Sequence, residues 1–344
     1  MRKILCFLVC LVALSCSVAF ASGAEPKETQ LDEKYLLGLY KGNGELLLVR
    51  ENDGRLNILY RYLEEDHDYR QSNVFPLKKE RYDVYAIREA GALTSTEGTV
   101  RFERDKEGYG ISCNVGGNRY TRVFFDAEKE EPFKVEVIKP LTELRQEIEK
   151  ATMPVQTAEA KAELVNLTQL PQLKLDLRYA TAQNCFSEPL YTEYKAYLNK
   201  DAVNALAKVT ERLADYGYGL VVWDAYRPWK VTKLAHDALT EDYKKILPSG
   251  EEGSIHNTGN AVDLSLYNLE TGELVDMISD FDEPSPRQYG SFAGGTSLQR
   301  WQRNLLQQIM SVHGFTPSEM EWWHFDYLAD TKYQLLDIPF NELP

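Results

Sequence analysis

The stretch SIHNTGNAVDLSL, residues 254–266, decides how the second half of the chain folds. The letters NTG are typical of a turn, and the apolar run that follows them predicts a buried strand. A carboxylate such as Asp263 is poorly suited to a strand interior, and it is costly to bury unless it is paired or binds a metal ion. His256 precedes it in the turn, and imidazole and carboxylate are both ligands that suit zinc. The stretch therefore indicates either a metal site or a loop histidine followed by a capping aspartate.

A second motif, EMEWWHF at residues 319–325, places Glu321 three residues before His324. Water bound to zinc needs a general base nearby, and a carboxylate close to a histidine ligand can provide one. The two tryptophans between them would exclude solvent and strengthen local electrostatic interactions. The alternative is that EWWHFDYL is simply an aromatic core strand in which Glu321 and His324 make polar contacts.

The third motif is WDAYRPW, residues 223–229. Arg227 follows a buried strand predicted for residues 219–226, and Pro228 ends that strand. A fixed guanidinium near a reacting carbonyl can stabilise the negative charge that develops on its oxygen. Asp224 can orient the guanidinium as a bidentate partner. A purely structural Asp–Arg pair is the alternative.

Together the motifs supply three nitrogen or oxygen ligands, a general base and an oxyanion-stabilising group. The fourth zinc position is left to water, as in catalytic zinc sites, whereas structural sites are closed by four protein ligands. The combination indicates hydrolytic metal chemistry far more specifically than any single motif does.

The motifs DAYRP, SIHNTGNAVD and EWWHF, in this order, resemble those of the zinc D-alanyl-D-alanine dipeptidases. These are VanX-type enzymes of peptidase family M15, within the group of D,D-peptidases that share a Hedgehog-like fold. The likeness covers roughly residues 164–344 and includes LDLRYATAQNCF at 175–186. The resemblance implies one zinc ion bound by His256, Asp263 and His324.

The resemblance also implies roles for other residues. Glu321 would be the general base, and Arg227 would stabilise the tetrahedral intermediate. In DMISDFDEP, Asp282 resembles the residue that binds the substrate's ammonium group. Weaker substrate contacts carried over from the family are Ser254 and Tyr179. The stretch EPSPRQYGSFAGG after Asp282 departs from the family pattern, so we expect the mouth of the pocket to differ.

Helical and strand patterns alternate irregularly in the second half of the chain, which favours an α+β fold with an antiparallel sheet and flanking helices. Helices are predicted for residues 200–217, 229–247 and 297–314, with Ser297 as N-cap and Gly314 as terminator.

The first half of the mature chain, residues 26–126, reads as a separate all-β domain. Turn signals such as Asn52-Asp53-Gly54 lie between apolar runs and predict hairpins in a small antiparallel sheet or barrel. Residues 127–163 are charged and predict a linker with one surface helix. The catalytic domain is then expected over residues 164–344.

Residues 1–21 predict a secretory signal peptide, because a basic start precedes an apolar run and the small-residue pattern Ala19-Phe20-Ala21. Lipid attachment at Cys16 is the alternative. We therefore expect an exported protein, periplasmic or secreted, without a transmembrane segment. Cys113 and Cys185 remain in the mature chain, and we expect two buried thiols, with an interdomain disulfide as the alternative.

The formal net charge is −14, and no dense basic patch with interleaved aromatic residues is evident, so nucleic acid is not expected as a partner. The expected partner is a small D,D-dipeptide or a peptidoglycan fragment, and the expected reaction is hydrolysis of D-alanyl-D-alanine with Glu321 as base. Two alternatives stay open. One is a D,D-carboxypeptidase or endopeptidase acting on peptidoglycan stem peptides, and the other is a catalytically inert wall-binding protein.

Overall fold

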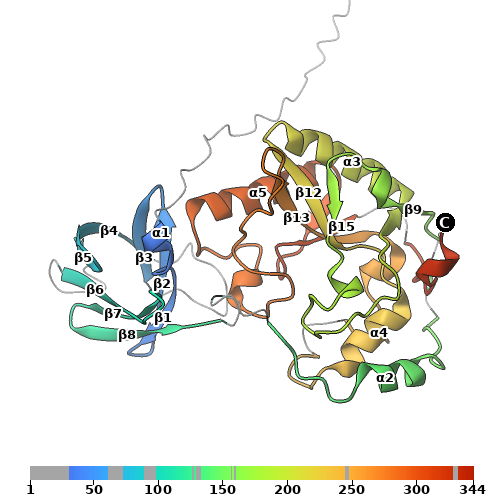
Figure 1. Cartoon of the computed structure of the whole chain (residues 1–344), viewed down its shortest axis with the longest axis horizontal. Coiled ribbons are helices and arrows are strands. Elements are labelled where there is room, and N and C mark those ends of the chain that lie inside the picture. Colours follow the sequence, from blue (N-terminus) through green and yellow to red (C-terminus); the bar gives the residue numbers. More distant parts are fainter. Residues whose placement is uncertain are drawn as a thin grey trace, which may run out of the picture.

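The computed structural model describes residues 31–60, 73–88, 98–125, 128, 133–155, 157–158, 160–244, 248–327 and 332–344. The predicted signal peptide, with Cys16, lies outside the described residues. The described chain forms a small all-β unit and a larger mixed unit that pack against each other (Figure 1). Within this described part, no helix is long and apolar enough to cross a membrane.

The first unit is a closed barrel of antiparallel strands, and the pairing of β1 with β8 closes it. A short helix, α1 (Leu31–Lys34), precedes the barrel. The strands are β1 (Gly38–Gly42), β2 (Glu45–Asn52), β3 (Arg55–Tyr60), β4 (Asn73–Arg81), β5 (Val84–Ile87), β6 (Gly98–Arg104), β7 (Gly110–Val115) and β8 (Asn118–Val123). The predicted hairpin between β2 and β3 is present. Asp53 and Gly54 have positive φ angles of 51° and 76°, as a two-residue hairpin turn requires.

The larger unit contains a five-stranded sheet with the order β10–β12–β13–β15–β14 and a two-stranded sheet of β9 and β11. β10 runs parallel to β12, and the other neighbours in the larger sheet are antiparallel. The strands are β9 (Leu164–Asn166), β10 (Leu173–Leu175), β11 (Tyr197–Asn199), β12 (Tyr218–Asp224), β13 (Ala261–Asn268), β14 (Phe315–Pro317) and β15 (His324–Tyr327). This mixed topology confirms the predicted α+β class.

The helices of this unit bury one apolar face each, as their sequence periodicity predicts. They are α2 (Leu141–Ile148), α3 (Lys200–Ala214), α4 (Trp229–Ala238) and α5 (Ser297–Val312). α3 packs on β12 and on α5, while α2 packs on α4. The charged segment before the catalytic domain therefore contributes Leu141, Leu144 and Ile148 to the main core.

Several helix boundaries differ from the sequence prediction, and α3 and α5 end at Ala214 and Val312, before the predicted residues 217 and 314. α4 ends at Ala238, because Leu239 is extended and forms a bridge with Val137. The N-cap of α5 is Thr296 and not Ser297, because the Thr296 hydroxyl accepts a hydrogen bond from the Gln299 backbone N–H at 3.1 Å. Gly314, with φ of 90°, follows the end of α5 as predicted.

The last predicted strand also starts later than expected. β15 begins at His324, and the two preceding tryptophans form a turn. The Trp322 backbone N–H donates to the Gln288 carbonyl at 2.8 Å, which draws this part of the chain out of the sheet. Glu321 therefore lies on a turn at the strand entrance.

Candidate active site

Three adjacent strands place acidic and imidazole side chains in one row across the sheet. Asp224 at the end of β12 is paired with Asp263 on β13, and Asp263 is paired with His324 on β15. Directly opposite residues of antiparallel strands have neighbouring side chains. Strand register therefore brings together residues that are far apart in the sequence.

His256 enters this row from the short 3-10 helix η5 (Ile255–Thr258), immediately before β13. Ser254 caps η5, and its hydroxyl accepts a hydrogen bond from the His256 backbone N–H at 3.3 Å. Gly259 then turns the chain into β13 with φ of 76°. A Cβ atom at Gly259 would lie 2.6 Å from the Leu164 side chain, so the turn needs glycine for both space and backbone conformation.

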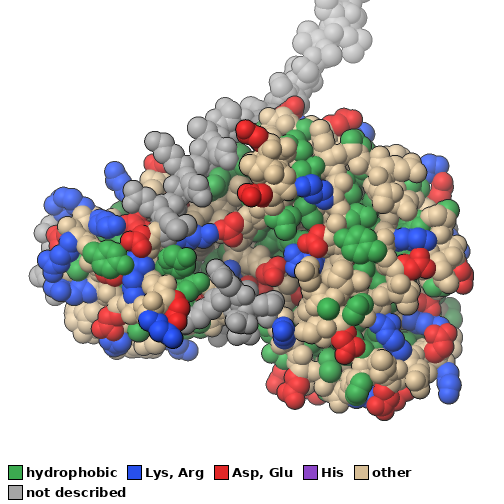
Figure 2. Space-filling view, viewed as in Figure 1, with side chains coloured by type: hydrophobic (Ala, Val, Ile, Leu, Met, Phe, Trp, Pro, Cys, Tyr) green, Lys and Arg blue, Asp and Glu red, His purple; other side chains and the backbone are tan. Residues whose placement is uncertain are grey.

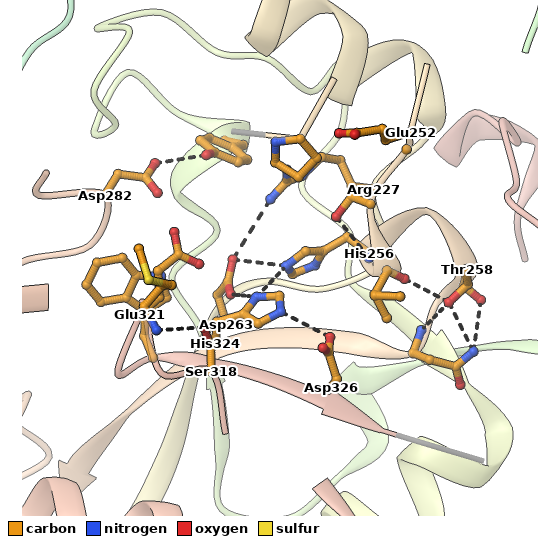
Figure 3. A pocket seen from close by; sticks show the side chains of 18 of the residues that line it. Arg227, Glu252, His256, Thr258, Asp263, Asp282, Ser318, Glu321, His324 and Asp326 are labelled. Carbon is orange, nitrogen blue, oxygen red and sulfur yellow. Dashed lines mark hydrogen bonds and ion pairs between the residues drawn. The ribbon is translucent and has the colours of Figure 1, made fainter. Parts of the chain in front are cut away.

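Among the described residues, His256, Asp263 and His324 offer ligand atoms that all lie within 4.8 Å of one another. His256 Nε2 lies 3.3 Å from Asp263 Oδ2 and 3.2 Å from His324 Nδ1. His324 Nδ1 lies 2.9 Å from Asp263 Oδ1. Two imidazole nitrogens and a carboxylate thus converge on one point (Figure 3).

In each ring one nitrogen points away from Asp263 and the other points toward it, and the hydrogen bond of the outward nitrogen determines whether the inward nitrogen carries a proton. His256 Nδ1 lies 2.6 Å from the Ala225 carbonyl, and His324 Nε2 lies 3.0 Å from Asp326 Oδ1. Because these oxygens only accept, the outward nitrogens donate. In neutral rings the inward nitrogens then present lone pairs to Asp263. Such a set of acceptors needs a shared cation, so the three residues fit a bound divalent metal ion.

The pKa shifts of Asp263 and His324 agree with a site that favours a bound positive charge. Burial alone would raise the pKa of Asp263, but the neighbouring imidazoles of His256 and His324 lower it well below its usual range. Burial would lower the pKa of His324, yet its hydrogen bonds to Asp263 and Asp326 raise it well above the ordinary value.

Arg227 lies just beyond β12 and is buried, with 5% of its surface exposed. Its Nε and Nη2 lie 2.9 Å and 2.7 Å from the same oxygen of Asp224, Oδ2. The sequence suggested a bidentate pair, in which two nitrogens bind two carboxylate oxygens, but here both nitrogens contact one oxygen. The second oxygen of Asp224 accepts from the Tyr191 hydroxyl and from the Ala225 N–H. Arg227 Nη2 also lies 3.9 Å from Asp263, at the edge of the metal-ligand group.

Glu321 and Asp282 face the ligand group from the side opposite Thr258 (Figure 3). Burial raises the pKa of Glu321. Burial, together with the charge of Glu321, raises the pKa of Asp282 to about 8. The Tyr179 hydroxyl donates to Asp282 at 2.8 Å. The structure therefore brings these predicted substrate and base residues into one space.

One cavity of about 810 Å³, which Ser254 also borders, is lined by the ligand group and the residues around it, namely His256, Asp263, His324, Asp326, Glu321, Asp282, Tyr179 and Arg227. Asp224 lies behind Arg227 and is fully buried. The cavity is also lined by apolar residues, namely Phe133, Val135, Leu239, Ile255 and Leu335. A space of this size, lined by both apolar and polar side chains, is typical of a small-molecule site.

The sequence analysis assigned no role in the site to Asp326, Tyr191 or Cys185. Asp326 holds His324, Tyr191 holds Asp224, and the Cys185 thiol lies 3.7 Å from Asp282. A strand places residues i and i+2 on one face, so the spacing of His324 and Asp326 was a usable signal. No comparable local signal marks Tyr191 or Cys185. Both cysteines are free and buried, as expected for thiols.

The buried acceptors, the raised pKa of Glu321 and the arginine beside them fit a hydrolytic metal site at the edge of an α+β sheet. Comparison with known proteins agrees with this class. Residues 160–342 match the family Peptidase_M15, described as D-ala-D-ala dipeptidase. The chain therefore belongs to this family, and it is a hydrolase and a metallopeptidase.

The curated relatives carry the same description. A D-alanyl-D-alanine dipeptidase of Escherichia coli is 34% identical over 180 residues, which is 52% of this chain and 92% of that protein. One from Enterococcus faecalis is 31% identical over 190 residues, which is 49% of this chain and 89% of that protein. The solved structure of an LD-carboxypeptidase, LdcB, matches at 21% sequence identity, and the match spans 50% of this chain and 70% of that chain. Its TM-score of 0.32 is too low to establish a shared fold.

Proposed function

We propose that this protein is an exported, zinc-dependent D-alanyl-D-alanine dipeptidase. The observation that carries the proposal is the convergence of three ligand atoms with Glu321, Arg227 and Asp282 in one cavity of a chain of this family. Two imidazole nitrogens and one carboxylate oxygen suit zinc, with one position left for water.

A divalent ion bound by His256, Asp263 and His324 would polarise the scissile carbonyl and lower the pKa of a water molecule. Glu321 accepts a proton from the attacking water and passes it to the leaving amine as the C–N bond breaks. Its raised pKa suits both steps, because the carboxyl must hold the proton transiently. Arg227, held by Asp224, stabilises the negative charge that develops on the carbonyl oxygen.

The amino end of the dipeptide binds at Asp282. A free ammonium group beside this carboxylate would favour its ionised form and lower the pKa that burial raises. Tyr179 keeps the carboxylate in place through its hydroxyl. Recognition of a free ammonium one residue from the scissile bond distinguishes a dipeptidase from an enzyme that acts on longer peptides.

The cavity volume favours a second candidate, a carboxypeptidase that acts on peptidoglycan stem peptides. About 810 Å³ is more than two alanyl residues fill, so the cavity has room for a longer substrate, for which Phe133 and Val135 offer apolar contacts. In that reaction the ammonium of the dipeptide would be replaced by an amide, and Asp282 would have no charge to bind.

The test follows release of free alanine, D or L as the substrate dictates, from D-Ala-D-Ala, L-Ala-L-Ala and a stem pentapeptide ending in D-Ala-D-Ala. Each substrate is incubated with zinc-loaded protein, with and without a chelator. Chelator-sensitive cleavage of the D,D-dipeptide alone is the expected result. Preferential cleavage of the pentapeptide would replace the dipeptidase proposal with the carboxypeptidase, and no cleavage of any substrate would contradict both.

Export is proposed on the predicted signal peptide, residues 1–21. An exported enzyme would meet dipeptides and peptides released from the cell wall. Expression of the full chain, followed by cell fractionation and N-terminal sequencing, tests this. A mature N-terminus after Ala21 outside the cytoplasm is expected, and an uncleaved cytoplasmic chain would contradict it.

A further inference from the structure

The segment of residues 277–296 lies between the barrel and the active site. An apolar cluster separate from the two main cores joins it to the barrel. The cluster consists of Leu39, Leu48 and Leu59 on the barrel and Ile278, Phe292 and Ala293 on the segment, all at most 4% exposed. Both ends of the segment are therefore fixed to the outer face of β1, β2 and β3.

A buried carboxylate reinforces this contact at the C-terminal end of the segment. Glu51 on β2 is fully buried, and its Oε2 accepts hydrogen bonds from the Ser297 backbone N–H at 2.6 Å and from the Ser297 hydroxyl at 2.7 Å. The Glu51 N–H donates to the Gly295 carbonyl at 3.2 Å. Arg300 donates to the Glu51 carbonyl at 2.7 Å. A carboxylate at the N-terminus of α5 also interacts favourably with the helix dipole.

The opposite side of the same segment forms part of the active site. The Phe281 ring lies 5.7 Å from the rings of Tyr179 and Trp323, measured between centroids. The Ser279 hydroxyl accepts from Trp322 Nε1 at 2.8 Å, and the Gln288 carbonyl accepts from the Trp322 N–H at 2.8 Å. The segment is thus bonded to the residue that follows Glu321.

Asp282 itself has φ of 58°, a backbone conformation that is costly for a residue other than glycine. Such a conformation persists only where the surroundings hold it. Between Ile278 and Thr296, the regular structure is limited to the 3-10 turn η6 (Pro286–Gln288). Tyr179, Trp322 and Trp323 hold the segment from the side of the catalytic unit, and the barrel holds it at its two ends.

We propose that the barrel positions the subsite for the substrate's ammonium group, with Glu51 as the polar positioning residue that acts through the 277–296 segment on Asp282. This inference rests on the proposed function, because it assumes that Asp282 binds the ammonium. The barrel then serves the catalytic unit as a fixed support for substrate binding.

Full-length, zinc-loaded Glu51→Gln and Glu51→Ala proteins test the proposal, with Glu103→Gln as the matched control. Glu103 is a barrel glutamate on β6 whose exposed side chain pairs with Arg119. We expect the KM for D-Ala-D-Ala to rise about tenfold in Glu51→Ala and less in Glu51→Gln, since small displacements of binding groups have large effects. The control should keep the wild-type KM. A KM in Glu51→Ala equal to that of the control would overturn the proposal.

A double-mutant cycle separates positioning from general damage to the fold. In an Asp282→Asn background, adding Glu51→Ala should change KM by less than about twofold, because the two residues act through one interaction. Independent, multiplicative effects would overturn the proposal. Wild-type protein that does not hydrolyse D-Ala-D-Ala would contradict the proposed function itself, which is a different outcome from an active enzyme indifferent to Glu51.

Discussion

The barrel and the catalytic unit bury charged groups in opposite ways. In the barrel, buried Arg122 donates to the Tyr35 carbonyl at 2.7 Å and pairs with Glu128 at 3.3 Å. In the catalytic unit, Asp263, Asp282 and Glu321 share one cavity, and each of the latter two has its pKa raised in part by a neighbouring carboxylate. The buried charges of the barrel are met by groups of the protein, since Arg122 pairs with Glu128 and Glu51 binds Ser297, whereas the catalytic unit leaves a demand for cations that a metal ion and a substrate ammonium can meet.

The surfaces of the two units do not show this difference. Charged side chains of both signs are scattered over both units on the face seen in Figure 2. The buried groups therefore indicate function, and we expect substitutions of buried carboxylates to change activity or stability more than substitutions of exposed ones.

The largest effect is expected for Glu321→Gln. Because the amide cannot accept the proton of the attacking water, kcat should fall by about a thousandfold or more. Metal content, measured by elemental analysis, should stay at the wild-type level. Glu319→Gln, two residues away on the surface, is the matched control and should retain wild-type turnover. Wild-type turnover by Glu321→Gln would refute the assigned base.

Arg227→Lys should have the next largest effect. Lysine keeps the charge but cannot reproduce the two guanidinium contacts to Asp224. We expect kcat to fall about a hundredfold, as for the loss of one oxyanion donor. Steady-state kinetics with D-Ala-D-Ala measures this, and Arg119→Lys on the barrel surface is the control. Unchanged kcat would leave Arg227 with a structural role only.

Asp282→Asn should stabilise the metal-free protein at high pH. Burial and the charge of Glu321 raise the pKa of Asp282 to about 8, above its unfolded value. The folded state thus binds this proton more tightly, and stability is lost as pH rises from about 4 towards 8. Asparagine removes the titration and still accepts from Tyr179. Urea unfolding should show a variant more stable than wild type by at least about 1 kcal/mol at pH 8, and by less at pH 5. If the stability difference between Asp282→Asn and wild type did not grow with pH, the raised pKa of Asp282 would be contradicted.

The smallest effect is expected for Glu103→Gln on the barrel. This exposed ion pair with Arg119 should contribute little to stability, so the urea unfolding midpoint of the variant should match that of wild type. Activity should not change. A large loss of activity would mean that the outer face of the barrel also serves the active site.

Local patterns in the sequence predicted the hairpins, the apolar helix faces and the residue types of the site. The turn at Asn257-Thr258-Gly259 is such a local pattern, because the positive φ angle of Gly259 follows from the conformational preference of glycine. Barrel closure by β1 and β8 was not predictable in the same way, because it depends on pairing between residues distant in the sequence. The same holds for the register that aligns Asp224, Asp263 and His324.

The errors arose where tertiary contacts override local preference. The helical pattern after Ala238 is interrupted by the bridge between Leu239 and Val137. Ser297 is a good N-cap by type, but its hydroxyl binds Glu51 of the barrel, and the adjacent Thr296 caps the helix. Contacts between the two units could not be read from either unit's sequence.

We propose that the buried acceptors His256, Asp263 and His324 of the catalytic unit bind one metal ion. X-ray absorption at the zinc edge, combined with elemental analysis of wild type and Asp263→Ala, tests it most directly. We expect one zinc per wild-type chain, bound by nitrogen and oxygen ligands without sulfur, and loss of zinc in Asp263→Ala. Sulfur ligation, or zinc retained in full by Asp263→Ala, would contradict it.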